Sequence, residues 1–568
     1  MESRSFNRIL TDMLHGFSVG RTAFRSSIGQ FLHGRACLMI PALSLLSTTL
    51  FSQPKKPNIL FIAVDDLKTE LGAYGSRIAK TPNIDRLAAT GTVFLANYCQ
   101  QAVCGPTRAS LMTGMRPDYT KVWDLKTRMR DMNPDILSLP QHLIAQGYST
   151  QGIGKIYDPR CVDKDLDLPS WSVPYHKTKG KYYAPDHGEP VVGWFQNPGN
   201  KALAEQYAKE AAEKGITKSG EVRDYVLTKL KPTTESADVP DNAYNDGANV
   251  LQARDILAEL SKQKDKPFFL AVGLSKPHLP FISPKRYWDL YKRDEMPLAG
   301  FAKKPENAVE MAMHNSGEIR SYTDIMDISK KPSDKDNGIS LPEDKQRELI
   351  HGYFAAVSYT DANVGVLLRA LDSLGLRENT IVVLWGDHGW HLGDHNLWCK
   401  HSNFEQATRT PLIISAPGIK PSVTRSPTEF VDIFPTLCDL TSSAIPEQLH
   451  GKSLVPVMRD PRLKVKEFSV SQYPRSGRTS ENERLGYADG NVMGYSIRTE
   501  RYRYTLWMSN GFRSDRPFDP KLILGQELYD YVKDPEERVN QHAGKEYARV
   551  EKDMHAKMLE HLRQQVRK

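Results

Sequence analysis

Cysteine is scarce in this sequence, with six residues among 568. No two of them form a CxxC pair, so their spacing gives no sign of a zinc site. Cys37 lies in an apolar segment near the N-terminus, which leaves five cysteines at irregular spacings. Because five is an odd number, a framework in which every cysteine is paired is excluded, and at least one thiol is unpaired or modified.

Several other patterns are missing. The chain has no internal repeat, no low-complexity tract and no run of Lys and Arg interleaved with aromatic residues, which argues against a repeat protein and against a nucleic-acid-binding protein. The net charge of +8 is a mild positive excess that favours an acidic ligand. A hydrophobic content of 39% and a charged content of 25% are typical of a globular protein. At 568 residues, we expect two domains, or one large domain with a smaller partner.

One long apolar run stands near the N-terminus, in residues 36–52, "ACLMIPALSLLSTTLFS", directly after Arg35. Pro41 interrupts it and it is too short to span a membrane, whereas its length and its small final residues are typical of a signal peptide. Because the leader before it is long, either the start codon is misassigned or the segment is an uncleaved anchor. We predict that residues 1–52 direct export, to the periplasm or out of the cell, without stable membrane insertion.

Buried strands alternate with helices over about 400 residues of the chain. Four runs rich in apolar and β-branched residues predict strands, at 58–64, 267–273, 380–386 and 411–418, and a weaker run at 147–155 predicts a fifth. Segments with helical periodicity lie between them, at 81–91, 249–263 and 359–375. The alternation predicts an α/β fold with a mostly parallel sheet. Two polar stretches, 176–231 and 299–347, are expected to be surface insertions, and the first could also form a rim for an anionic polysaccharide.

Polar clusters recur just past the carboxyl ends of the predicted strands, the edge at which open α/β sheets bind ligands. They contain Asp65, Asp66, Lys155, His278, Asp387 and His388. A single Asp at such a place is usually a turn or cap residue. Two adjacent carboxylates repel each other unless a cation lies between them, and a second Asp with a neighbouring His adds two ligands. This oxygen-rich set favours Ca²⁺ or Mg²⁺ over zinc.

Cys104 stands at the predicted start of a helix that runs to Gly114, with Pro106 in its first turn. At this point the sequence allows three roles for this cysteine: a buried hydrophobic residue, half of a disulfide, or a reactive group. Its place at the positive end of the helix, beside Arg108, favours a bound anion. An anion, a metal and a special cysteine together indicate transfer of a charged group such as sulfate or phosphate.

The pentapeptide "CGPTR", residues 104–108, resembles the C-x-P-x-R signature of type I sulfatases, the formylglycine-dependent family. The resemblance extends from about residue 57 to 508, through "TPNIDRLAATGTVF", "FFLAVGLSKPHLPF", "DHGWHLGDH" and "KHSNFEQATRTPLI". It implies an alkaline-phosphatase-like α/β domain over 53–455, with a large mostly parallel sheet flanked by helices. A smaller α+β domain over 456–568 would hold an antiparallel sheet, from segments 467–473 and 494–507.

The resemblance also implies a chemistry. Cys104 would be oxidised to Cα-formylglycine by a maturation enzyme, and one Ca²⁺ would be bound by that residue with Asp65, Asp66, Asp387 and His388. The other matching site residues are Arg108, which would hold the formylglycine hydrate, Lys155 and Lys400, which would contact the sulfate, and His278, which would protonate the leaving alcohol oxygen. The implied substrate is a sulfated glycosaminoglycan such as heparan or dermatan sulfate, cleaved at the 2-O-sulfate of iduronate or a related uronate.

One position departs from the family pattern. Where sulfatases usually have a histidine three residues after the lysine of "GK", this chain has Asp158. A carboxylate there could act as a base or could repel the sulfate, and His176 is a possible substitute. Two aromatic residues, Trp390 and Tyr473, could stack on a sugar, although packing in the core explains them equally well.

Two other functions remain open from the sequence. A phosphomonoester or phosphodiester hydrolase of the related alkaline-phosphatase-like superfamily would share the fold without the formylglycine. A non-catalytic glycan-binding pseudo-sulfatase is suggested only by Asp158. Pro106 and Arg108, which maturation enzymes read, argue against the first, and the complete set of metal-ligand candidates argues against the second.

Overall fold

The computed structural model describes residues 56–326, 338–475, 492–509 and 519–565. The chain divides into two units, Met1–Lys55 and Lys56–Lys568, and all of the described residues belong to the second. The predicted signal segment 1–52 lies outside the described residues. Within the described ranges, every helix is too short or too polar to cross a membrane.

The central sheet has seven strands, and all five sequence-predicted strands belong to it. In spatial order they are β12 (Ser422–Thr424), β2 (Thr92–Phe94), β11 (Leu412–Ser415), β8 (Thr380–Gly386), β1 (Asn58–Val64), β6 (Phe268–Leu274) and β4 (Ser149–Gly154). The four strands β8, β1, β6 and β4 are parallel to one another, whereas β11 runs antiparallel to β8. The sheet is therefore mixed but mostly parallel, and the predicted α/β, alkaline-phosphatase-like architecture is confirmed.

Strand β1 shows why a continuous apolar run forms this sheet. Its alternate side chains Leu60, Ile62 and Val64 pack into a core on one face, and the intervening side chains pack into a second core on the other. All seven residues of the strand are buried. A central strand with cores on both faces needs apolar residues along nearly its whole length, and after Asn58 this strand has no hydrophobic–polar alternation.

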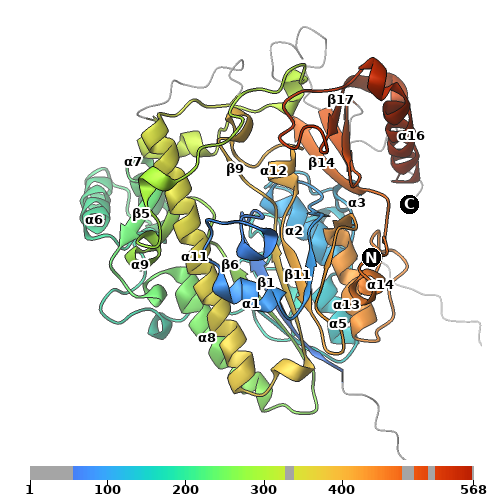
Figure 1. Cartoon of the computed structure of the whole chain (residues 1–568). Helices are drawn as coiled ribbons and strands as arrows, with labels where there is room; N and C mark the ends of the chain where they lie inside the picture. Colours follow the sequence, from blue (N-terminus) through green and yellow to red (C-terminus); the bar gives the residue numbers. More distant parts are fainter. Residues whose placement is uncertain (1–55, 327–337, 476–491, 510–518, 566–568) are drawn as a thin grey trace, which may run out of the picture. The chain divides into compact units, whose positions relative to one another are not determined.

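Helices cover both faces of the sheet (Figure 1). One core contains side chains of α8 (Asn245–Ser261) and α11 (Glu343–Ser373), and the other contains side chains of α2 (Cys104–Thr113), α5 (Leu139–Ala145) and α13 (Ile433–Leu440). Helix α11 has 31 residues, so the predicted helix 359–375 is only its second half. The expected insertion 299–347 therefore ends inside a core helix, because the polar first turn of α11 concealed its start.

A second, antiparallel sheet lies in the C-terminal part of the chain. Its strands, in order, are β14 (Ser469–Arg475), β15 (Val492–Arg498), β16 (Tyr502–Met508) and β17 (Ile523–Asp530), and helix α16 (Ala548–Gln565) packs against it. Strand β14 is also joined to the chain just before Cys104, because Ser471 Oγ donates to Cys99 O over 2.6 Å and Gln472 N donates to Gln100 O over 2.7 Å. The C-terminal sheet thus supports the segment that leads into α2.

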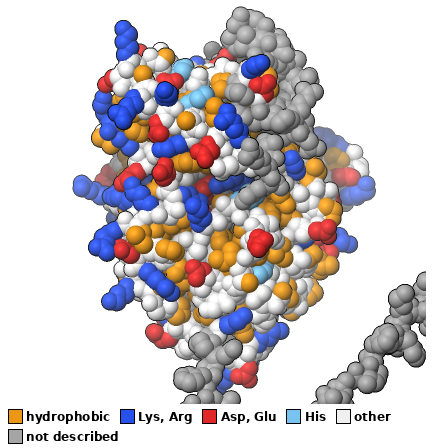
Figure 2. Space-filling view, turned by 90° about the vertical axis from the view of Figure 1, so that its right-hand side faces the viewer, with side chains coloured by type: hydrophobic (Ala, Val, Ile, Leu, Met, Phe, Trp, Pro, Cys, Tyr) orange, Lys and Arg blue, Asp and Glu red, His pale blue; other side chains and the backbone are white. Residues whose placement is uncertain are grey.

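The surface seen in Figure 2 carries both signs of charge. Lys and Arg side chains are scattered among Asp and Glu side chains on this face, without one continuous basic area. This distribution agrees with the mild net charge of +8. A nucleic-acid surface of the usual kind would gather its basic side chains.

Gly273 in β6 offers a test of the sheet edge. A Cβ atom at this position would collide with the backbone of Lys155, which follows the neighbouring strand β4. We expect Gly273→Ala to lower the free energy of unfolding by about 1–3 kcal/mol, as overpacked sites do, and to displace Lys155. The measurement is the thermal midpoint together with the turnover of a substrate bound at this edge.

Gly180→Ala is the matched control, since a Cβ there meets no heavy atom within 4 Å. Equal thermal midpoints for the two variants would contradict the close approach of β6 to Lys155.

Candidate active site

The polar residues predicted from the strand ends do meet at one edge of the central sheet. Val64 of β1 pairs with Gly386 of β8, so the residues that follow them, Asp65 and Asp387, emerge side by side. The backbone fixes these loops, because Asp387 N donates to Val64 O over 3.1 Å. Lys155 N donates to Gly273 O over 3.2 Å, which holds the end of β4 at the same edge.

Cys104 is the first residue of α2, as the sequence predicted, and Gly114 ends the helix with a left-handed φ of 67°. The thiol is buried, and its Sγ atom lies 3.5 Å from His388 Nε2. All cysteines among the described residues are free, so a disulfide is not the fate of Cys104 in this structure. Burial, and then the charge of Asp65, raises the pKa of the Cys104 thiol well above its usual value. Without a bound cation, this pocket therefore disfavours the thiolate form of Cys104.

Arg108, one turn further along α2, ties the loops together. Its Nη2 donates to Asp65 Oδ1 and its Nε donates to Asp387 Oδ2, each over 3.0 Å. Its Nη1 donates to the backbone oxygens of Lys155 and Ile156. One buried guanidinium thus bridges the ends of three strands and compensates two buried carboxylates.

The donor set at this edge fits a hard divalent cation. Ligand atoms of Asp65, Asp66, Cys104 and His278 lie within 4.8 Å of one another, and so do those of Cys104, Asp387 and His388. His388 Nδ1 must donate to the Gly389 carbonyl, 2.9 Å away, so a neutral ring turns its Nε2 lone pair toward Asp66 Oδ1 at 3.3 Å. Two acceptors that face each other in this way are suited to sharing a cation.

The pKa of Asp66 also reflects the close packing of buried carboxylates at this edge. Burial raises the pKa of this carboxyl to about 7, and the neighbouring Asp65 adds to the shift, although Lys400 opposes it. A bound cation would remove this penalty, since a positive charge favours the ionised form. The residues present therefore fit the metal that the sequence predicted.

Two lysines project into the same site. Lys155 Nζ donates to Asp65 Oδ2 over 2.5 Å. Lys400 Nζ lies 3.1 Å from both Asp66 Oδ1 and Glu318 Oε1, and it stands 4.9 Å above the ring of Trp390. Both ammonium groups are therefore within reach of an anion bound beside Cys104.

His278 presents one ring nitrogen to the site. Its Nδ1 donates to Leu279 O over 2.5 Å, which leaves Nε2 facing Glu318 Oε1 at 3.3 Å and Asp66 Oδ2 at 3.7 Å. Burial, together with the charge of Lys400, lowers the pKa of this imidazole. Nε2 is thus the atom that can exchange a proton with a bound molecule.

Two adjoining cavities open at this edge. The larger, of about 440 Å³, brings together four predicted residues, Cys104, Lys155, His278 and Lys400. Residues from segments that had no clear sequence signal also line it: Arg160, Trp194, Lys231, Glu318 and Tyr322. His401, the neighbour of Lys400, lines it as well. A second cavity of about 210 Å³ shares Lys155, Trp194 and His278 with the first.

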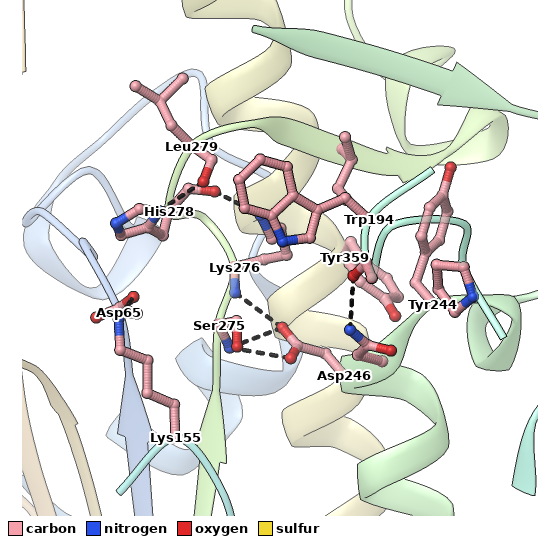
Figure 3. A pocket seen from close by; sticks show the side chains of 14 residues that line it. Asp65, Lys155, Trp194, Tyr244, Asp246, Ser275, Lys276, His278, Leu279 and Tyr359 are labelled. Atoms are coloured by element: carbon pink, nitrogen blue, oxygen red, sulfur yellow. Dashed lines mark hydrogen bonds and ion pairs between the residues drawn. The ribbon is translucent and has the colours of Figure 1, made fainter. Parts of the chain in front are cut away.

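The second cavity shows how the loop of His278 is held (Figure 3). Asp246 at the start of α8 accepts hydrogen bonds from the backbone N–H groups of Ser275 and Lys276. Lys276 Nζ donates to the carbonyls of His278 and Pro280 over 2.5 and 2.7 Å. The hydrogen bonds that hold this loop were not predicted from the sequence, where their only indication is Lys276, two residues before His278.

Three other residues discussed from the sequence are not among the residues that line these two cavities. Trp390 is fully buried beneath Lys400. Tyr473 stacks with the Arg475 guanidinium, 4.7 Å from its ring centroid. His176 Nε2 lies 2.8 Å from Gln151 Oε1, a partner that occupies one of its ring nitrogens.

Comparison with known proteins agrees with this geometry. The family model described as "Sulfatase" matches residues 57–443, most of the chain. This chain belongs to the sulfatase family. It is therefore a sulfuric ester hydrolase. A second model, for the C-terminal part of N-sulphoglucosamine sulphohydrolase, matches residues 393–565 of the sulfatase.

Individual relatives cover nearly the whole sulfatase. Iduronate 2-sulfatase of Mus musculus is 32% identical over 84% of this chain and 89% of its own length. The Homo sapiens enzyme of the same name is 32% identical over 81% of this chain and 86% of its own length. Among solved structures, a phosphonate monoester hydrolase of Agrobacterium radiobacter has a TM-score of 0.63 at 22% identity, covering 90% of this chain and 96% of that chain. At this identity the likeness concerns the fold.

The bridge made by Arg108 can be tested by removing its charge. Arg108→Gln leaves Asp387 without its guanidinium partner and Asp65 with Lys155 alone, so we expect the free energy of unfolding to fall by about 3–5 kcal/mol in metal-free buffer. Denaturant unfolding followed by circular dichroism provides the measurement.

The control is Arg462→Gln, which breaks an exposed pair with Asp460 and should leave stability unchanged. Similar stabilities for the Arg108 and Arg462 variants would show that the bridge does not hold the site together.

Proposed function

We propose that this sulfatase removes the 2-O-sulfate of iduronate, or of a related uronate, from glycosaminoglycans such as heparan or dermatan sulfate. The observation that carries the proposal is the 32% identity, over 84% of the chain, to a relative named iduronate 2-sulfatase. The cavity beside Cys104 suits an anionic substrate, because Lys155, Lys400 and Arg160 all contribute to its wall.

We propose that Cys104 becomes Cα-formylglycine through a maturation enzyme that reads Cys104, Pro106 and Arg108. The position of Cys104 supports this, since it is the first residue of α2, its Sγ lies 3.5 Å from His388 Nε2, and it forms no disulfide. A hydrated formylglycine supplies two hydroxyls on one carbon, one to attack sulfur and one to expel the sulfate afterwards.

The metal in this proposal is Ca²⁺, held by Asp65, Asp66, Asp387 and His388 together with residue 104. When bound, it would neutralise the clustered carboxylates and lower the pKa of the attacking hydroxyl. Oxygen ligands in this number favour Ca²⁺ or Mg²⁺ over softer metals.

The remaining side chains have separate roles in the proposed reaction. Lys155 and Lys400 orient the sulfate oxygens and offset the charge that develops on them. Arg108 keeps Asp65 and Asp387 in place beside residue 104. When protonated at Nε2, where Glu318 Oε1 lies 3.3 Å away and favours the charged ring, His278 would deliver that proton to the sugar oxygen as the S–O bond breaks.

The proposal extends to export and to domain organisation. Residues 1–52 would direct export, which would bring the enzyme to extracellular or periplasmic glycans. Residues 53–455 would form the catalytic domain and 456–568 the smaller one, which carries the antiparallel sheet.

Metal dependence should appear in both stability and activity. We expect a chelator to lower the thermal midpoint and to abolish turnover, and Ca²⁺ to restore both, because Asp65, Asp66 and Asp387 repel one another without it. At a free Ca²⁺ concentration one hundred times its Kd, the stabilisation is about 2.7 kcal/mol. Unchanged midpoint and activity after chelation, confirmed by metal analysis of the sample, would refute the site.

The role of Cys104 should be visible in Cys104→Ser. A hydroxyl is close to a thiol in size, so this variant should fold and bind Ca²⁺ nearly normally. It should not turn over, because a sulfated serine has no second hydroxyl with which to release sulfate. Mass spectrometry of the peptide that contains residue 104 should detect either the trapped sulfate or, in the wild type, the formylglycine.

Cys438→Ser is the control, since Cys438 lies in α13 and its removal should leave turnover intact. Multiple turnovers by Cys104→Ser would support the phosphohydrolase alternative, and a wild type inactive despite conversion of Cys104 would support the pseudo-sulfatase.

A further inference from the structure

Asp158 and Arg160 form a closed ion pair at the wall of the larger cavity. Asp158 Oδ1 accepts from Arg160 Nε over 2.9 Å and from the Arg160 backbone N–H over 3.0 Å. Its Oδ2 accepts from Arg160 Nη2 over 2.8 Å. The Asp158 side chain is fully buried, whereas that of Arg160 is 54% exposed.

This pairing leaves Asp158 little capacity for proton transfer. Burial opposes ionisation, but the hydrogen bonds from Arg160 and the charge of Lys155 together lower the pKa of Asp158 below its usual value. Its two oxygens are already occupied by three donors. The carboxylate is thus a fixed anchor for a guanidinium.

Arg160 differs from the other cations of the cavity. Lys155 and Lys400 are both paired with carboxylates of the predicted metal site. Lys231 donates to Ser321 Oγ over 2.8 Å and stands over the ring of Tyr322. Arg160 has five N–H donors, and Asp158 takes one from Nε and one from Nη2. Within the described ranges, no protein acceptor pairs with its Nη1. The outer edge of the fork is therefore free to meet a ligand in the cavity, which Arg160 lines together with Cys104.

We propose that Arg160 binds the carboxylate of the uronic acid whose sulfate is cleaved, and that Asp158 is a positioning residue that orients the guanidinium. This inference rests on the function proposed above. An Arg fork and a carboxylate match in geometry and form strong charge-assisted hydrogen bonds. The carboxylate and the 2-O-sulfate project from opposite sides of a pyranose ring, so the enzyme needs two anion contacts, with Lys155 and Lys400 at one and Arg160 at the other.

The experiment compares two substrates that differ only in the carboxylate. One is a disaccharide ending in 2-O-sulfated iduronate, and the other is the same molecule with the carboxyl group reduced to a hydroxymethyl group. For Arg160→Gln we expect KM for the first to rise on the order of 10- to 100-fold at nearly constant kcat, as befits loss of hydrogen bonds between charged groups. Kinetics on the reduced substrate should change less than about threefold, within the range of a surface substitution.

The positioning role of Asp158 has its own signature. Asp158→Asn should raise KM on the carboxylate substrate by a smaller factor and spare the reduced substrate. Because Asp158 acts through Arg160, the double variant should be no worse than Arg160→Gln alone. Arg160→Lys should rescue little, since an ammonium cannot pair with Asp158 and face a second carboxylate with the same planar fork. Arg254→Gln, in an exposed pair on α8, is the control.

Each outcome decides for or against the inference. Equal losses on both substrates would place Arg160 at the sulfate or in the folding of the loop, and would overturn the inference. If Arg160→Gln had unchanged kinetics on both substrates, or if the wild type hydrolysed both substrates equally well, the inference would also be overturned. A wild type that contains formylglycine and Ca²⁺ but hydrolyses neither sulfate would overturn the proposed function, and this inference with it.

Discussion

The structure of the site depends on the compensation of buried charge by Arg108. Asp65 and Asp387 leave adjacent parallel strands and are fully buried, which is costly for two carboxylates unless a cation lies between them. Arg108 reaches both from helix α2, so the residue that neutralises them also fixes the start of the helix that carries Cys104. Arg108 therefore constrains the distance between the predicted metal ligands and the predicted nucleophile, together with Thr107, whose Oγ1 donates to Asp387 O over 3.0 Å.

Much of this arrangement could be predicted from the sequence, for a physical reason. Asp65 and Asp387 stand directly after apolar strands and Lys155 follows a weaker one, and the carboxyl ends of parallel strands lie at one edge. The pairing of β1 with β6 and β8 brings them together as expected. The direction of β11 could not be predicted, because an apolar run of four to eight residues has the same pattern in either orientation.

The cavity residues that were not predicted from the sequence have another property in common. Glu318, Trp194 and Arg160 lie in segments without helical or strand periodicity, and two of these segments were assigned to surface insertions. Their places at the cavity follow from how long loops pack on the finished core, which local sequence does not encode. Asp158 was recognised as a departure from the family pattern, but only the structure revealed its pairing with Arg160.

The contact between strand β14 and the chain before Cys104 has a consequence for the order of events during synthesis. The two partners, Ser471 and Cys99, are 372 residues apart, which at about 5–20 residues per second separates their synthesis by roughly 20–70 s. In the folded protein Cys104 is buried, so the proposed maturation enzyme would need to reach it before the chain has folded fully. During that interval the segment that leads into α2 lacks the two hydrogen bonds that β14 gives it in the folded protein.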